Sequence, residues 1–512
     1  MAKLNRVLEN STLYLIGNVA GRIVGFLAIP IYSRFLTPSQ FGVIELIELS
    51  TEIIAITLGL QSIGVALTRV FHEKRTVADQ NGVISTGLLS TALLGGCIAG
   101  VAILAAAPIS QAVFHTASMT NVMRAAFVAM FFSYVLEITL TYARIQGRAL
   151  FFLRYSLVTL AIGVALNIVF IGVLKAGVWG FVLSKLSIVI VASIYLLSLT
   201  FREVGWRFDR SLIPELARFG APLAVSGLAY FLIHFSDRFF LAGAVTLADL
   251  GKYALAYRFA FIVSILVGDS FGKSWNVTFY RYAGEAGWQQ QFAQVAAYLM
   301  FALCTVALGL SIFRPELLHF MVPPAFYPPV FLLPLLVFAY VFREFGDFFN
   351  NLLLINKRAG LVGRIATVGA VINCLLNWVL IGRFGIYGAA WATLLTWVIY
   401  MIICWVSATR EHRVPVRVPG FIMIVALSAA VFFLSYALRV QTYVLQVALD
   451  GVWVAVFVGL CLCFYFTAVE RRHLLDWATA LIERYLRGLL RLVGAQPAET
   501  VTLVKPGSDA GS

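Results

Sequence analysis

The chain has 512 residues, of which 61% are hydrophobic and only 12% are charged, and its mean hydropathy is +0.91. A soluble globular domain has about half apolar and about a quarter charged residues, so this composition excludes a soluble globule and indicates a polytopic membrane protein. The formal net charge of +14 does not indicate a nucleic-acid partner, because most Lys and Arg residues fall in alternate loops between apolar runs.

The long apolar runs predict an all-α polytopic membrane protein with fourteen transmembrane helices. About 20 mostly apolar residues cross a bilayer as a helix, and lipid-exposed backbone must satisfy its own hydrogen bonds. In chain order, the predicted spans cover residues 11–35, 41–67, 83–108, 119–143, 151–174, 179–200, 214–241, 250–275, 291–313, 329–354, 360–382, 386–407, 418–438 and 448–468.

Positive charge accumulates on one side of the predicted membrane. Basic residues cluster in loops such as 69–75, 144–154 and 202–210, whereas the opposite loops hold isolated cations such as Lys175 and Arg383. The positive-inside rule therefore places both termini in the cytoplasm, which an even number of spans requires.

An internal repeat divides the chain into two related halves. The segment LNIVFIG at 166–172 matches LNWVLIG at 376–382, which lies 210 positions later. A Gly-apolar-aromatic-Gly corner follows each copy, at 177–180 and at 385–388. Membrane proteins built from two related halves commonly bind their substrate between the halves, so the repeat indicates a transporter.

The repeat and the composition predict five segments. Apolar residues at helical spacing among arginines after the last span indicate an amphipathic helix on the cytoplasmic leaflet, and the small, polar tail beyond it is typical of disorder. The segments are an N-terminal six-helix half at 1–205, a C-terminal six-helix half at 206–412, transmembrane helices 13 and 14 at 413–470, the amphipathic helix at 471–495, and the disordered tail at 496–512.

Ionisable residues inside the predicted spans mark the candidate site. Each costs at least about 2.5 kcal/mol in the bilayer interior on insertion scales, so each should face a wet cavity or a charged partner. They fall mainly on predicted spans 1, 2 and 4 and on spans 7, 8 and 10, which are equivalent in the repeat. We therefore predict that these helices line a polar cavity between the two halves.

Two sets of residues are the candidates for this cavity. Arginine suits bidentate phosphate contact and lysine acts as a point charge. The basic set, predicted to bind a diphosphate or an anionic sugar, is Arg22, Arg34, Arg238, Arg258, Lys273 and Arg343. The acidic set, predicted to balance charge or couple ions, is Glu48, Glu137, Asp237, Asp269 and Asp347. The sequence predicts no catalytic and no metal-binding residues.

Several of these residues also have a simpler interpretation. Arg34 and Lys273 lie near span ends, where long basic side chains reach into the membrane interface. Asp237 beside Arg238 suits a structural ion pair, and Glu45, at the start of a predicted span, is interpreted as an interfacial residue.

Glu137 and Asp347 are related by the repeat. They align at the 210-residue offset, and both positions carry a carboxylate. We therefore expect these two residues to share a mechanical or ion-coupling role.

Several motifs together carry a family resemblance. They are the two Asn-containing repeat segments, the run GIYGAAWAT at 385–393 and the segment RFLTPSQFG at 34–42. With the fourteen predicted spans, these motifs over roughly residues 8–470 resemble the polysaccharide-biosynthesis flippases. These are the Wzx-type O-antigen and exopolysaccharide exporters of the multidrug/oligosaccharidyl-lipid/polysaccharide (MOP) superfamily.

The resemblance implies a flippase of the bacterial inner (cytoplasmic) membrane. Such a protein moves a polyprenyl-diphosphate-linked oligosaccharide to the outer leaflet by alternating access, for O-antigen, exopolysaccharide or capsule biosynthesis. Its partners would be the lipid-linked glycan, membrane lipids and glycan-assembly proteins such as a polymerase, with no nucleic acid. No cofactor is expected. Since the chain shows no P-loop signature, energy would come from an H⁺ or Na⁺ gradient or from consumption of the substrate outside.

Three other functions compete with this one. A lipid II flippase also has fourteen spans, whereas a multidrug exporter of the same superfamily usually has twelve and would favour an acidic cavity for a cationic cargo. A membrane glycosyltransferase, polymerase or ligase would need a sizeable external loop with catalytic groups. The external loops of this sequence are short, so we predict that the protein is not an enzyme.

Overall fold

The structure is a computed structural model that describes residues 26, 29–356, 358–476 and 479, and every regular element in that part of the chain is helical. The first half contains α2 (Ile29–Phe35), α3 (Pro38–Thr57), α4 (Leu60–Glu73), α5 (Val77–Leu104), α6 (Ala106–Phe114), α7 (Thr120–Ile145), α8 (Ala149–Asn167) and α9 (Gly177–Val204). The second half contains α10 (Leu212–Ala242), α11 (Leu247–Ala260), α12 (Asp269–Tyr282), α13 (Trp288–Ile312), α14 (Arg314–Met321), α15 (Leu332–Ile355) and α16 (Ala359–His412). Two further helices follow, α17 (Val418–Ala437) and α18 (Tyr443–Leu460).

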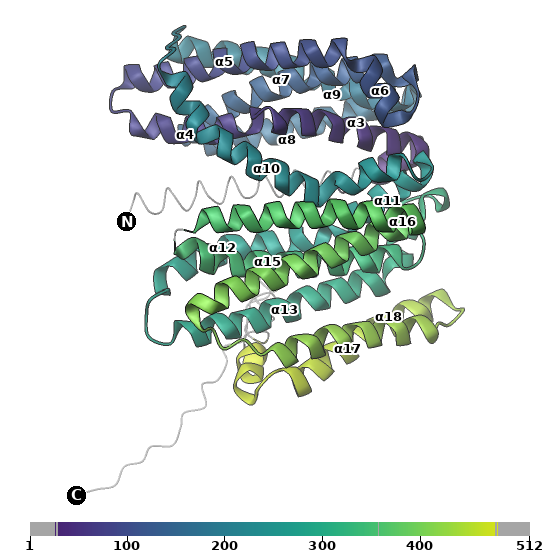
Figure 1. The fold of residues 1–512 in the computed structure, drawn as a ribbon. Helices are drawn as coiled ribbons and strands as arrows, with labels where there is room; N and C mark the ends of the chain where they lie inside the picture. The colour runs from purple at the N-terminus through teal and green to yellow at the C-terminus, as the bar shows by residue number, and fades with distance from the viewer. Residues whose placement is uncertain (1–25, 27–28, 357, 477–478, 480–512) are drawn as a thin grey trace, which may run out of the picture.

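The helices form two bundles that lie side by side (Figure 1). One bundle holds α3 to α9 and the other holds α11 to α16, while α17 and α18 cover the far side of the second bundle. The bundles meet where α11 packs on α3 and where α10 packs on α3 and α4. The two related halves predicted from the repeat are therefore two bundles that meet through a small group of helices.

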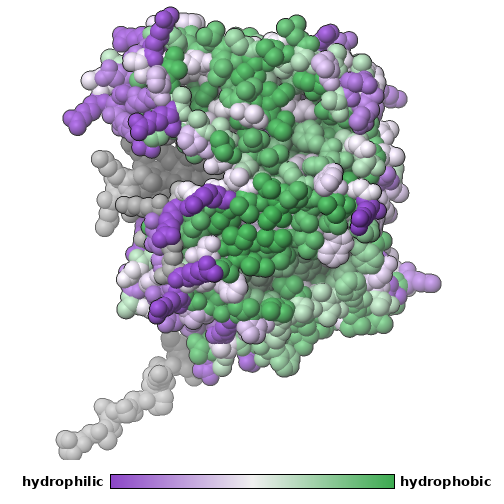
Figure 2. Space-filling view, in the orientation of Figure 1, coloured by the Kyte–Doolittle hydropathy of each residue, from purple (hydrophilic) through white to green (hydrophobic). Residues whose placement is uncertain are grey.

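Ten helices in the described residues are long and apolar enough to cross a membrane, so the protein is a multi-pass membrane protein. Figure 2 shows the corresponding broad apolar surface over both bundles, with hydrophilic residues gathered at the two ends of the helices. Helices α3 and α15 are not among the ten, and each carries three charged side chains, while α16 contains two of the predicted spans. The count of fourteen stays a prediction.

The two glycine corners of the repeat adopt the same geometry. Gly177 and Gly385 both have positive φ, 55° and 53°, which favours glycine. A Cβ on Gly388 would lie 2.1 Å from the carbonyl oxygen of Leu380, and a Cβ on Gly180 would lie 2.9 Å from the backbone of the preceding segment. The chain therefore turns back on itself at both corners too closely for a side chain, and α16 is two arms joined at Gly385.

The asparagines of the repeat bind the first helix that the structure describes in their own half. Asn167 donates through Nδ2 to the hydroxyl of Tyr32, at 3.0 Å, on α2. Asn377 donates to the Oγ atom of Ser236, at 3.3 Å, on α10, and to Asn373, at 2.8 Å. Hydrogen bonds between helices of this kind help to hold a membrane bundle together.

The predicted segment boundaries fall near helix ends but stay predictions. Helix α9 ends at Val204, and α16 ends at His412. The joining segment lies against α5, since the backbone N–H groups of Arg207 and Asp209 donate to hydroxyl groups of that helix. The predicted disordered tail and most of the predicted amphipathic helix and first span lie outside the described residues.

A buried carboxylate connects the start of α17 to the helix that follows α18. Glu470 accepts from the N–H and the hydroxyl of Thr467, each at 2.8 Å, in a capping arrangement at the start of the helix that follows α18. Both of its oxygens also lie 3.1 Å from the guanidinium of Arg417, which directly precedes α17. Burial opposes ionisation of Glu470, but these hydrogen bonds and the charge of Arg417 outweigh it and lower its pKa.

Replacing Glu470 with Gln should lower the thermal unfolding temperature at neutral pH. Because the folded pKa is depressed, the carboxylate stabilises the fold above its unfolded pKa of about 4.3, and this contribution disappears as the pH falls through the folded value. The expected loss is about 1–3 kcal/mol at pH 7, from hydrogen bonds to a charged group. Thermal unfolding of the purified protein at several pH values measures it.

The control for this experiment is Glu73→Gln, which removes an exposed i,i+4 partner of Arg69 and should change stability little. A Glu470→Gln deficit that stays the same size from neutral to acid pH would contradict the assignment.

Candidate functional site

A cavity of about 490 Å³ lies between the two halves. Helix α3 of the first half and helices α10, α11 and α15 of the second half supply most of its lining. Its polar lining residues are Glu45, Glu48, His234, Arg238, Arg258 and Arg343, and its aromatic lining residues are Phe26, Phe235, Tyr257, Phe261 and Tyr340. The site is therefore a cavity with both charged and aromatic lining residues.

Arg238 lies almost fully buried in the wall that α10 contributes. Its Nη1 atom donates to Asp237, at 2.8 Å, and to the carbonyl oxygen of His234, at 2.6 Å. The guanidinium lies 3.8 Å from the ring centre of Tyr257, a cation–π distance. Its Nε atom lies 3.7 Å from a Glu45 oxygen but has no hydrogen-bond partner among the described residues.

Arg343 occupies a similar position on α15. Its Nη1 atom donates to Glu344 and to the hydroxyl of Ser264, each at 3.0 Å. Its Nε atom lies 3.7 Å from a carboxylate oxygen of Asp347, and within the described part of the chain that buried nitrogen has no hydrogen-bond partner. Each of these two arginines thus has one buried N–H group that faces a carboxylate at ion-pair distance without forming a hydrogen bond.

Arg258 joins the second half to the first. Its Nη2 atom lies 2.9 Å from Glu45 and 3.7 Å from Glu48, both on α3. The guanidinium also lies 4.8 Å from the ring centre of Phe41 on the same helix. This arginine is therefore held from the opposite half by two carboxylates and an aromatic ring.

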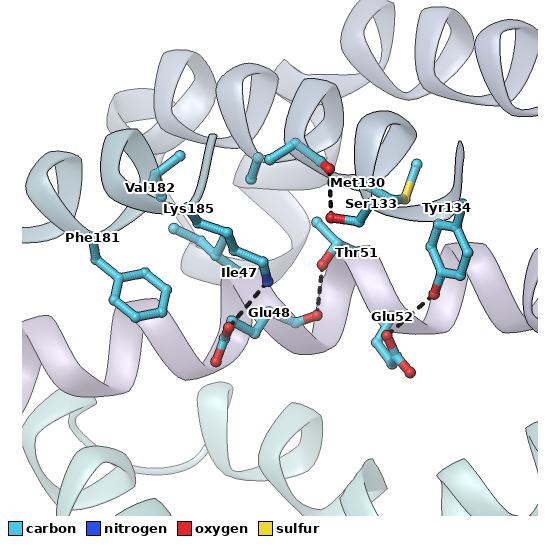
Figure 3. Close-up of a pocket in the computed structure, with 12 residues that line it drawn as sticks. Ile47, Glu48, Thr51, Glu52, Met130, Ser133, Tyr134, Phe181, Val182 and Lys185 are labelled. Atoms are coloured by element: carbon cyan, nitrogen blue, oxygen red, sulfur yellow. Dashed lines mark hydrogen bonds and ion pairs between the residues drawn. The ribbon is translucent and has the colours of Figure 1, made fainter. Parts of the chain in front are cut away.

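A second, smaller pocket opens inside the first half. It has a volume of about 80 Å³ and lies between α3, α7 and α9. Figure 3 shows Lys185 reaching the carboxylate of Glu48, at 3.2 Å, and the hydroxyl of Tyr134 donating to Glu52, at 3.3 Å. Because Glu48 lines this pocket and also the larger cavity, it stands at the boundary between them.

The structure brings several of the predicted residues together. Glu48, Arg238, Arg258 and Arg343 line the same cavity, although they come from four different helices. Asp237 does not line the cavity, but it forms an ion pair with Arg238, which does. The sequence also suggested this ion pair.

Asp347 lies beside Arg343 on α15. It accepts a hydrogen bond from the hydroxyl of Tyr400, at 2.8 Å, and one from Asn350, at 3.2 Å. It therefore belongs to a cluster of polar side chains that touches the cavity through Arg343.

Other predicted residues lie elsewhere. Arg34 is exposed at the end of α2 and does not line the cavity. Glu137 also does not line it, because its carboxylate forms an ion pair with Arg144 on the same helix, α7, where both side chains are partly exposed. The expected role shared with Asp347 has no support from the cavity geometry. Arg22 and the side chains of Lys273 and Asp269 lie outside the described part of the structure.

Glu45, which the sequence analysis interpreted as an interfacial residue, is buried and lines the cavity. Its exposed fraction is 7%, and it lies within ion-pair distance of both Arg258 and Arg238. Its spacing of three residues from Glu48 could have indicated the role, since residues at that spacing share a helix face. No group of three His, Cys, Asp or Glu side chains suited to a metal ion occurs among the residues that the structure describes.

Solved structures with this fold are membrane transporters. The lipid II flippase MurJ in an inward closed conformation matches with a TM-score of 0.71 at 12% identity, over 88% of this chain and 98% of that chain. An inward-facing multidrug resistance MATE family transporter of the MOP superfamily matches with a TM-score of 0.59 at 16% identity, over 76% of this chain and 94% of that chain. At such low identity, these structures show the fold alone, which is that of the MOP transporters.

The family follows from the sequence match. The family model described as "Polysaccharide biosynthesis protein" matches residues 31–326, and the chain belongs to this family. The Lsg locus putative protein 1 of Haemophilus influenzae is 24% identical over 270 residues, which make up 51% of this chain and 63% of that relative. The family and the fold are thus those that the sequence predicted.

Proposed function

We propose that this protein is a flippase that moves a polyprenyl-diphosphate-linked oligosaccharide from the cytoplasmic to the outer leaflet of the bacterial inner membrane. The observation that carries the proposal is the set of three arginines, Arg238, Arg258 and Arg343, around one cavity between the halves. Of the three side chains, Arg258 is the most exposed, at 33%, and Arg238 is almost fully buried. A diphosphate supplies several acceptor oxygens and the charge that guanidinium groups favour.

The rest of the cavity suits the other parts of such a substrate. Aromatic rings, including Tyr257, Tyr340 and Phe261, give it apolar walls on which the faces of sugar rings can pack. Glu45 and Glu48 can accept hydrogen bonds from sugar hydroxyl groups. Binding at the contact between the halves also suits alternating access, in which the halves rock around the bound substrate.

The proposal includes the orientation of the chain in the membrane, the energy source and the partners. Both termini lie in the cytoplasm, since the basic loops mark that side. Transport uses no cofactor and draws on an H⁺ or Na⁺ gradient or on consumption of the substrate outside. The partners are the lipid-linked glycan, membrane lipids and glycan-assembly proteins such as a polymerase.

Lipid II is a second candidate cargo. It carries a diphosphate between a polyprenyl chain and sugars, so the same arginines would bind it, and the fold likeness to MurJ covers 88% of the chain. A cationic drug is a poorer fit, because three arginines at the cavity would repel it.

Transport in reconstituted vesicles tests the proposed function. The purified protein should move a fluorescent polyprenyl-diphosphate oligosaccharide between leaflets, and protein-free vesicles should not. Fluorescent lipid II and the cationic dye ethidium are compared in parallel. Faster transport of ethidium than of either diphosphate lipid would contradict the proposal, and transport of lipid II alone would reassign the cargo.

A further inference from the structure

Glu48 stands between two cations that belong to different halves. One carboxylate oxygen lies 3.2 Å from the ammonium nitrogen of Lys185, on α9 of the first half. The other lies 3.7 Å from the guanidinium of Arg258, on α11 of the second half. The contact with Lys185 lies within the first half, whereas the contact with Arg258 crosses between the halves.

The contact with Arg258 is the weaker of the two. At 3.7 Å it is an ion pair without a short hydrogen bond, and the nearer partner of Arg258 is Glu45, at 2.9 Å. The contact with Lys185 meets hydrogen-bond distance. Glu48 can therefore leave Arg258 more readily than it can leave Lys185.

We propose that Lys185 is a positioning residue that holds the Glu48 carboxylate when an anionic headgroup takes over Arg258. This inference rests on the proposed function, because it needs a diphosphate in the cavity. The diphosphate competes with Glu45 and Glu48 for the guanidinium. A carboxylate that lost its only cation in a partly buried site would carry a large desolvation penalty, and Lys185 removes that penalty for Glu48.

The small pocket provides the room for this exchange. It lies on the side of Glu48 that faces Lys185, has a volume of about 80 Å³ and includes the polar side chains of Thr51 and Ser133 (Figure 3). Glu48 can turn toward this pocket and away from the larger cavity without losing polar surroundings. Arg258 then remains available to the phosphate oxygens.

The exchange has a consequence for the contact between the halves. The ion pairs of Arg258 with Glu45 and Glu48 join α11 to α3, which are also the helices that pack together where the bundles meet. When Arg258 binds the substrate, these ion pairs between the halves weaken. Lys185 therefore sets how strongly substrate binding loosens the two halves, although it does not touch the substrate.

A double-mutant cycle on the full-length protein tests the role of Lys185. The probe is farnesyl diphosphate, and its binding to the purified protein is measured by calorimetry in detergent. Lys185→Gln should weaken binding ~tenfold, because Glu48 then competes harder for Arg258. Glu48→Gln alone should strengthen binding, because it removes a competitor. In the Glu48→Gln background, Lys185→Gln should have almost no further effect.

Three results separate this role from a structural one. Lys185→Arg should keep near wild-type affinity, because it restores the cation beside Glu48. An equal loss of affinity from Lys185→Gln in both backgrounds would overturn the inference. Unchanged or weaker binding by Glu48→Gln would also overturn it, and that measurement does not require the Lys185→Gln variant to fold. Wild-type protein that binds no farnesyl diphosphate would instead contradict the proposed function itself.

Discussion

Arg258→Gln is expected to lower transport of a diphosphate-linked glycan by roughly two orders of magnitude, while the protein still accumulates in the membrane. The change removes the guanidinium that we propose to bind the diphosphate, and it leaves Glu45 and Glu48 in the cavity without that cation. Removing one member of a desolvated charge pair costs about 2–5 kcal/mol, which corresponds to a factor of roughly thirty or more. Transport in reconstituted vesicles, normalised to the amount of protein, measures the effect.

Two further variants make the result specific. Arg258→Lys should recover only part of the activity, because an ammonium group cannot form the bidentate contact of a guanidinium. Arg124→Gln is the matched control, since Arg124 is exposed and hydrogen-bonds Asn121 on its own helix. Normal transport by Arg258→Gln, or an equal loss in Arg124→Gln, would remove Arg258 from the proposed site.

The general architecture could be predicted from the sequence because membrane insertion imposes strong rules. Apolar length predicted helices, and the repeat predicted two halves. Arg238, Arg258 and Arg343 were found as candidates because a charge in the bilayer interior is costly and must be compensated. The cost of a buried charge identifies residues that avoid lipid. In this protein, the three arginines identified in that way line one cavity.

The partners of these arginines were harder to predict. The sequence predicts an interfacial position for Glu45 because the apolar run that contains it begins at residue 41. In fact α3 begins at Pro38, with Thr37 as its N-cap, so Glu45 lies about two turns inside the helix. Capping is a local hydrogen-bond effect that a count of apolar residues does not detect.

The placement of Glu137 shows a second limit of the sequence. The repeat aligns it with Asp347, but Arg144, two turns further along α7, supplies a partner on the same helix. Alignment of two halves predicts equivalent backbone positions. It does not predict which neighbour each side chain binds.

Helices α3 and α11 cross at the contact between the halves. Each helix begins with a capping threonine, Thr37 or Thr246, and each carries a glycine five residues later, Gly42 or Gly251. A Cβ on Gly42 would lie 2.2 Å from the carbonyl oxygen of Leu247. The two backbones therefore pass in direct contact, next to the ion pairs of Arg258 with Glu45 and Glu48 on the same two helices.

Gly251→Leu should force this crossing apart and abolish transport. Even the Cβ atom would lie 2.0 Å from the carbonyl oxygen of Pro38, and backbone cannot move aside as a flexible side chain can. Overpacking of this kind costs about 1–3 kcal/mol or more, so we also expect a lower unfolding temperature. The control is Gly309→Ala on α13, where a Cβ would meet no atom within 4 Å. If Gly251→Leu transported at the normal rate, close contact of α3 and α11 would not be required at any step of the cycle.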